Sequence, residues 1–205
     1  MVITELRTGW ERLLPGQSKL GEELLQAWSA PTRRYHNLTH LSECLTALEL
    51  LDGGHRAEYL ALWFHDSVHT NQPGVDEQRS ADLAQRRLDG IIPAEELTEV
   101  VRLIRLTVDH DPHPDDAPGA RVCDADLAVL GAEPSRFAAS VADLREELSN
   151  LSAAQWRDRR RTRVEQLLAT HPLFHSPEAQ RLWGEQALTN LTTELRQLQS
   201  SRHIC

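Results

Sequence analysis

The chain is short of the residues that several classes of protein depend on. Its 205 residues include 3 Cys, 1 Met, 2 Tyr and 3 Phe, and aromatic residues make up only 5%. Cys44, Cys123 and Cys205 form no CxxC pair. A disulfide framework or a zinc ribbon is therefore not expected, and a reducing compartment is the simplest interpretation.

Long apolar runs are also missing. The longest, residues 59–64, is far shorter than the roughly 20 residues that a membrane span needs. Charged residues interrupt the N-terminus at Glu5, Arg7, Glu11 and Arg12, where a signal peptide would be apolar. We therefore expect a soluble, cytoplasmic protein with no membrane partner.

Basic charge is in short supply as well. The 22 Lys and Arg residues against 31 Asp and Glu leave a net charge of -9. Binding to nucleic acid or to an anionic membrane needs a basic face, so neither partner is expected. The 40% hydrophobic and 26% charged residues are ordinary for a globular protein, and 205 residues fit one domain, spanning 1–205.

Helical periodicity runs through most of the sequence, and no segment alternates with period two for long enough to predict a strand. Leucines at 38, 41, 45, 48 and 51, for example, step by three or four. We predict an all-α bundle of about eight to ten helices. The expected spans are 4–14, 18–29, 37–52, 55–68, 76–89, 94–109, 121–131, 134–149, 152–170 and 177–199.

The ten histidines are not evenly spread. His36 and His40 are four residues apart, as are His65 and His69, so each pair shares a helix face if a helix runs through it. Asp66 follows His65 directly at the end of an apolar stretch, where a carboxylate is costly unless it is paired or bound to a metal.

Two further carboxylates, Asp124 and Asp126, lie in a second apolar stretch, Val122–Gly131. Imidazoles and carboxylates that converge from several helices can bind Mn, Co, Ni, Fe or Zn, and this mixed set of donors does not choose among these metals. A single HxxxH pair or a single buried Asp has the simpler interpretation of a surface pair or a helix cap. The combination favours a metal site.

The order of these residues resembles that of the HD-domain metal-dependent phosphohydrolases, in particular an uncharacterised bacterial branch. Five segments in order carry the resemblance, which covers roughly residues 30–195. They are Arg33-x-Tyr35-His36-x-x-x-His40, Ala61-x-Trp63-Phe64-His65-Asp66-x-Val68, Asp76-Glu77-x-x-Ser80-Ala81, Ile104-x-x-Thr107-x-x-His110 and Asp124-Ala-Asp126-Leu-x-x-Leu-Gly131.

The resemblance implies that the metal is held by His40, His65, Asp66 and one of Asp124 and Asp126. Residues two apart on a helix point about 200° apart, so both aspartates cannot easily be ligands. Asp124 is the one we expect. His69, His110 and Asp126 are then candidates for a second metal or for alternative ligands.

Other charged residues receive roles by position. Arg33 and Arg34 precede His40 by about one turn and are candidates for binding substrate phosphate, because a guanidinium fork matches its oxygens. Asp66, Glu77 and His36 are the candidate catalytic groups. The simpler interpretation of the two arginines and of Glu77 is a solvated surface, and the same holds for the basic cluster at 157–163.

The expected function is therefore hydrolysis of a phosphate ester of a nucleotide or a similar small metabolite by metal-activated water. Two alternatives stay open. One is a nucleotide-binding HD scaffold without turnover, and the other is a di-iron HD-type oxygenase, for which His69 or His110 would supply extra ligands. A homo-oligomer is compatible with all three.

Overall fold

The protein is helical throughout the part of the chain that the computed structural model describes, residues 2–52 and 54–200. Its helices are α1 (Val2–Leu13), α2 (Ser18–Trp28), α3 (Leu38–Leu50), α4 (Arg56–Phe64), α5 (Val75–Leu88), α6 (Ala94–Leu106), α7 (Ala117–Leu127), α8 (Pro134–Glu147), α9 (Ala153–Ala169), α10 (Pro177–Ala179) and α11 (Glu185–Ser200). A 3₁₀ turn, Ala128–Gly131, follows α7, and a π-helical turn, Gln180–Gly184, joins α10 to α11.

The predicted all-α class is confirmed: the described residues contain no strand, and they form ten helices if α10 and α11 count as one. Most boundaries agree with the predicted spans to within a few residues. The exception that matters for the site is the predicted helix 55–68. It ends at Phe64, so the residues after His65 form turns instead.

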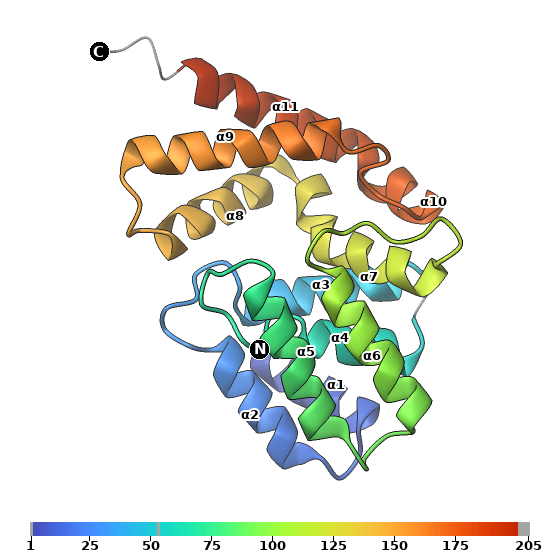
Figure 1. The fold of residues 1–205 in the computed structure, drawn as a ribbon. Helices are drawn as coiled ribbons and strands as arrows, with labels where there is room; N and C mark the ends of the chain where they lie inside the picture. Colours follow the sequence, from blue (N-terminus) through green and yellow to red (C-terminus); the bar gives the residue numbers. More distant parts are fainter. Residues whose placement is uncertain (1, 53, 201–205) are drawn as a thin grey trace.

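Helices α1 to α7 enclose the first of two apolar cores, drawn from blue to yellow-green in Figure 1. Trp10, Trp28 and Trp63 are fully buried there, and the Trp28 indole donates to the Trp63 carbonyl at 3.0 Å. Buried tryptophans of this kind combine a large apolar surface with one satisfied donor. They fix α1 and α2 against the end of α4, just before His65 and Asp66, which are called the HD pair below.

The 3₁₀ turn and helices α8 to α11 surround a second, smaller core that includes Phe137, Val164, Phe174 and Leu191. Figure 1 shows α8, α9 and α11 as a layer above the first group, with α7 between the two. Trp183 packs against both cores. The two parts are therefore in contact, and the prediction of a single domain stays a prediction.

Side chains cap the start of several helices. Asn37 accepts from the backbone N–H groups of Thr39 and His40 and starts α3. Ser152 and Gln155 form a capping box at the start of α9. Within the described residues, no helix combines the length and the apolar character that crossing a membrane requires.

Candidate metal site and cavity

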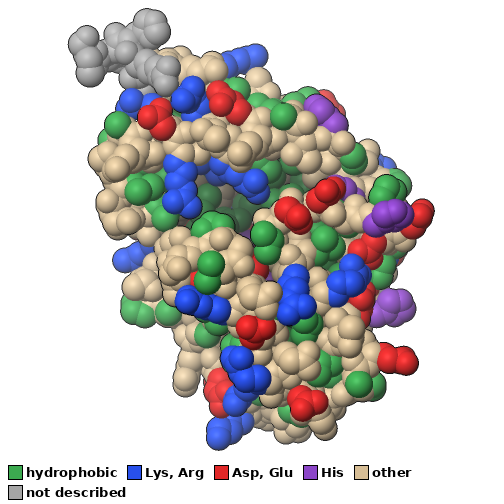
Figure 2. All heavy atoms as spheres, in the orientation of Figure 1, with side chains coloured by type: hydrophobic (Ala, Val, Ile, Leu, Met, Phe, Trp, Pro, Cys, Tyr) green, Lys and Arg blue, Asp and Glu red, His purple; other side chains and the backbone are tan. Residues whose placement is uncertain are grey.

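A cavity of about 700 Å³ lies between the two parts of the molecule. Its walls come from the start of α3, the turn after α4, the end of α7, and helices α8 and α9. Figure 2 shows the hollow with Lys and Arg side chains gathered along its upper rim. A volume of this size is typical of sites for small molecules.

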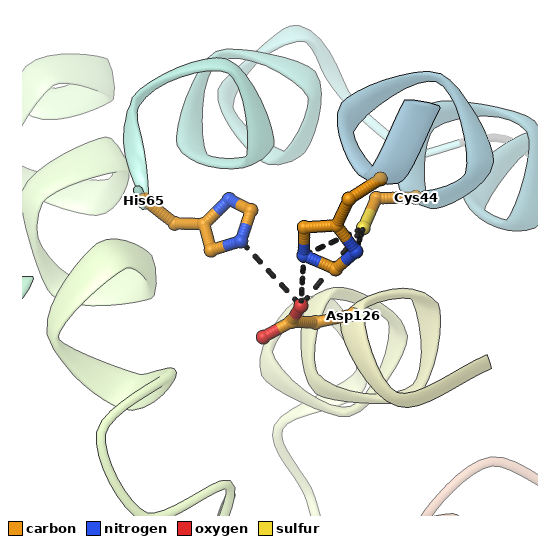
Figure 3. A group of neighbouring side chains, drawn as sticks. Cys44, His65 and Asp126 are labelled. Carbon is orange, nitrogen blue, oxygen red and sulfur yellow. Dashed lines mark hydrogen bonds and ion pairs between the residues drawn. The ribbon is translucent and has the colours of Figure 1, made fainter. Parts of the chain in front are cut away.

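Three of the predicted metal ligands, His40, His65 and Asp66, line the cavity close to one another. The Nε2 atom of His40 lies 3.1 Å from an Asp126 carboxylate oxygen. The Nε2 atom of His65 lies 3.4 Å from the same oxygen, and Figure 3 shows His65 directed toward Asp126. The Asp66 carboxylate lies 3.2 Å from His65 and 3.9 Å from His40. Helices α3 and α7 and the end of α4 thus bring two imidazoles and two carboxylates together.

The orientation of His65 follows from where α4 ends. His65 is the C-cap residue of α4, and its Nδ1 lies 2.8 Å from the Leu62 carbonyl oxygen, to which it donates. Its buried Nε2 makes no hydrogen bond of normal geometry with any described residue. A backbone contact at one ring nitrogen that leaves the other nitrogen for a cation is the usual arrangement of a metal-binding histidine.

The carboxylates of the cluster need positive charge beside them. Burial alone lowers the pKa of His65, but the carboxylates of Asp66 and Asp126 raise it well above its usual value. Burial acts to raise the pKa of Asp126, yet His65, His110 and His40 lower it well below its usual range. Two ionised carboxylates in a buried place are stable only with positive charge beside them.

The donor set therefore fits a divalent transition metal, and its mixture of nitrogen and oxygen atoms does not select one metal. The Cys44 thiol also belongs to the cluster, with its Sγ 3.6 Å from both ring nitrogens of His40. Burial raises the pKa of Cys44 well above its usual value, so the thiol is neutral. The sequence offered no motif that assigns Cys44 to the site.

Asp124, which we expected as the fourth ligand, is not in the cluster, and that prediction is wrong. Its two carboxylate oxygens accept from the backbone N–H groups of His175 and Ser176 at 2.7 and 2.8 Å. Asp124 thereby fixes the segment that starts α10. Asp126 points to the opposite side of α7 and lies in the cluster, in agreement with the angle of about 200° between residues two apart on a helix.

His110, a candidate for a second metal, belongs to this same cluster. Its Nε2 lies 2.9 Å from the second carboxylate oxygen of Asp126. The backbone carbonyl of His110 accepts from His175 at 2.8 Å. His110 therefore orients Asp126, and the loop before α10 holds His110 in place.

Arg33 and Arg34 do not face the cavity, so their predicted role in binding phosphate is wrong. The buried guanidinium of Arg33 donates to the carbonyls of Asp66 and Ser67 at 2.6 and 3.1 Å. It holds the turn that presents the HD pair. Arg34 is exposed, 3.8 Å from the carboxylate of Glu146.

Neither HxxxH pair lies on one helix face, because α3 begins at Leu38 and α4 ends at Phe64. The ring centroids of His36 and His40 are nevertheless 5.7 Å apart. Histidines of different segments also come together: the ring centroids of His40 and His65 are 5.6 Å apart, and those of His36 and His69 are 4.2 Å apart.

Glu147, at the end of α8, completes a second group with His36 and His69. One of its oxygens lies 2.5 Å from His36 Nδ1 and 2.9 Å from His69 Nε2. The other accepts from the backbone N–H groups of residues 34 to 36. Both carboxylate oxygens of Glu147 therefore have hydrogen-bond donors, and these contacts connect the end of α8 to the loops beside the metal cluster. No motif in the sequence pointed to Glu147.

Glu77, a candidate catalytic group, lines the cavity, and one of its oxygens accepts from the backbone N–H of Gly74 at 2.5 Å. This contact starts α5. His36 also lines the cavity, with its Nδ1 directed to Glu147. The catalytic roles of Glu77 and His36 stay predictions.

The basic cluster at 157–163 is only partly a solvated surface. Arg159, Arg160 and Arg163 line the cavity on the wall formed by α9. Arg160 is buried and makes a two-point contact with Glu194 at 2.7 and 2.9 Å, which joins α9 to α11. Positive charge therefore reaches the cavity from α9, rather than from the residues before α3.

The chain matches no protein-family model, no curated protein and no solved structure. The likeness to HD-domain phosphohydrolases therefore depends on the five sequence segments alone, and membership of that family stays a prediction.

Proposed function

We propose that the protein is a metal-dependent phosphohydrolase that cleaves a phosphate ester of a nucleotide or a similar small metabolite. The observation that carries the proposal is the buried cluster of His40, His65, Asp66 and Asp126 at the floor of a cavity large enough for such a molecule. The five segments that resemble the HD-domain family support it.

The proposal assigns metal binding to four residues and the positioning of one of them to His110. His40, His65, Asp66 and Asp126 would hold the metal. A bound divalent metal would supply activated water and polarise the phosphoryl oxygen. His110 orients Asp126 through its 2.9 Å contact.

Residues outside the cluster hold the turn that carries His65 and Asp66. Arg33 donates to its carbonyls, and the Leu62 carbonyl fixes the ring of His65. Support of this kind would hold the metal-binding atoms of His65 and Asp66 in position before a metal binds, which is the condition for a preorganised site.

The arginines of α9 support an anionic substrate. Arg159 and Arg163 face the cavity, and neither forms an ion pair with an acidic side chain in the described ranges. Leu144 and Leu148 of α8 supply apolar surface on the same side. A phosphate together with an organic group is the kind of ligand that both surfaces accommodate.

The test is release of inorganic phosphate from a panel of phosphorylated metabolites, with Mn, Co, Ni, Fe or Zn added in turn. We expect multiple turnovers with at least one metal. The variant His65→Ala should lose both bound metal and turnover. His113→Ala is the matched control, because the side chain of His113 is 74% exposed and does not line the cavity.

Absence of phosphate release with every metal would contradict the proposal, as would full activity in His65→Ala. Tight binding of a metabolite without turnover would favour the scaffold without catalysis. Two irons per chain and consumption of O₂ would favour the oxygenase.

A further inference from the structure

The side of α9 that carries Arg159 and Arg163 lines the cavity. The lining residues of this helix are 156, 158, 159, 160, 162, 163, 166 and 167. Among them, residues 156, 159, 160, 163 and 167 recur by three or four, a spacing that places them on one side of a helix. Arg157 and Arg161 lie about 200° from Arg159 and so point away from the cavity.

The three arginines on the cavity face differ in what neutralises them. Arg160 is bound by Glu194 at 2.7 Å. Arg159 and Arg163 have no carboxylate within ion-pair distance among residues 2–52 and 54–200. In contrast Arg161, on the opposite face, lies 3.5 Å from Asp158 and 3.9 Å from Glu165.

Arg163 is exposed, and the positive charge of Arg160 acts on its guanidinium. Desolvation by the surrounding protein atoms and the charge of Arg160 both lower the pKa of Arg163. The negative charge that opposes them is that of Asp126, the carboxylate at the metal cluster. An anion bound beside the Arg163 guanidinium would offset the repulsion from Arg160.

We propose that Arg159 and Arg163 form an oxyanion-binding subsite that holds the phosphate of the ligand on the side of the cavity opposite His40 and His65. Two guanidinium groups provide planar forks that match phosphate oxygens. The identification of this phosphate as part of a substrate rests on the proposed function, whereas the binding of phosphate by α9 does not.

The test is calorimetric titration of the full chain with inorganic phosphate, after treatment with a chelator and again with metal added. Compared with the wild type, we expect Arg163→Gln to weaken binding about tenfold or more, the usual scale for one charge-assisted contact. The double variant R159Q/R163Q should abolish measurable binding. Arg157→Gln, on the opposite face, should leave it unchanged.

Melting temperature and metal content are measured for each variant, to establish that it is folded. If R159Q/R163Q does not fold, R159K/R163K replaces it: the charge is kept but the fork is lost, so binding should fall without disappearing. Equal affinity in the wild type and the arginine variants would overturn the subsite. An equal loss in Arg157→Gln would also overturn it, since net charge alone would then explain the effect.

The outcome is independent of turnover. Phosphate binding that depends on Arg159 and Arg163, in a protein that hydrolyses no metabolite of the panel, would uphold the subsite and reject the hydrolase. Hydrolysis with unaltered KM in R159Q/R163Q would uphold the hydrolase and reject the subsite.

Discussion

Replacement of Asp126 by Asn should remove the metal, whereas the same replacement at Asp124, two residues away, should spare it. Asp126 places one oxygen 3.1 Å from His40 and 3.4 Å from His65, and the other 2.9 Å from His110. The carboxylate of Asp124 instead accepts from the backbone N–H groups of His175 and Ser176 at the start of α10. The two variants make the same chemical change in the same helix.

The expected loss of metal affinity in Asp126→Asn follows from the number of ligands. Four-ligand protein sites bind Zn²⁺ with roughly 10–16 kcal/mol, which corresponds to about 2.5–4 kcal/mol for each ligand. The amide keeps a neutral oxygen, so the lower part of this range applies. At about 1.4 kcal/mol for each factor of ten, the affinity should fall about 100-fold.

Asp124→Asn should instead lower the stability of the protein. Its amide can accept only one of the two backbone N–H groups, and a lost hydrogen bond to a charged group costs about 1.5–3 kcal/mol. For a chain of this size, each kcal/mol shifts Tm by about 2–4 °C, so Tm should fall by about 3–12 °C.

Metal affinity is measured by competition with a fluorescent chelator and metal content by elemental analysis, with calorimetry for Tm. Normal metal affinity in Asp126→Asn, combined with loss of metal in folded Asp124→Asn, would refute the assignment of the ligand.

Three further predictions concern the support of the site. Arg33→Ala should lower Tm and reduce metal content, because the backbone carbonyls of Asp66 and Ser67 lose their buried hydrogen-bond donor. An unchanged Tm would contradict this prediction. The ion pair of Glu147 should stabilise the fold most between about pH 4.5 and 6.5. It weakens as pH falls below the unfolded pKa of Glu, since His36 and His69 hold the folded pKa of Glu147 below it. It also weakens as pH rises through the raised pKa of His69. Urea titrations of the wild type and Glu147→Gln, made at pH values inside and outside this window, give the free energy of unfolding of each protein. The difference between the two should be largest inside the window, and a difference that does not change with pH would count against the ion pair. Gly21→Ala should destabilise by about 1–3 kcal/mol, because a Cβ would lie 2.3 Å from a Trp10 ring carbon, and thermal unfolding at wild-type Tm would exclude that overlap.

Helix spans were largely predictable, because apolar spacing and caps are local properties of the sequence. The end of α4 was not. Its apolar pattern continues to Val68, and only the contacts of Arg33 with the carbonyls after His65 show that the chain turns there. The partners of His36 and His69 could not be predicted for the same reason, since both depend on Glu147, about 80 residues further along the chain than His69.

The spacing of the α9 arginines could have been used to predict that several of them share one face of the helix. Their spacing by three and four places Arg159, Arg160 and Arg163 on one face, and Trp156 and Leu167 extend the same face. What the spacing could not show is that this face closes a cavity above the metal cluster, because that depends on how the second core packs on the first.

Periodicity along the sequence determined that the chain is helical, and the resemblance of its motif order to HD-domain proteins predicted that His40, His65 and Asp66 belong together. Helix geometry added that Asp124 and Asp126 cannot easily share one site, since residues two apart point away from each other. The tertiary structure decided which of the two lies in the cluster. The segment before α10 supplies backbone N–H groups to Asp124, and α3 and the end of α4 bring two imidazoles to Asp126. Packing between distant segments, rather than local preference, assigns each carboxylate its partner.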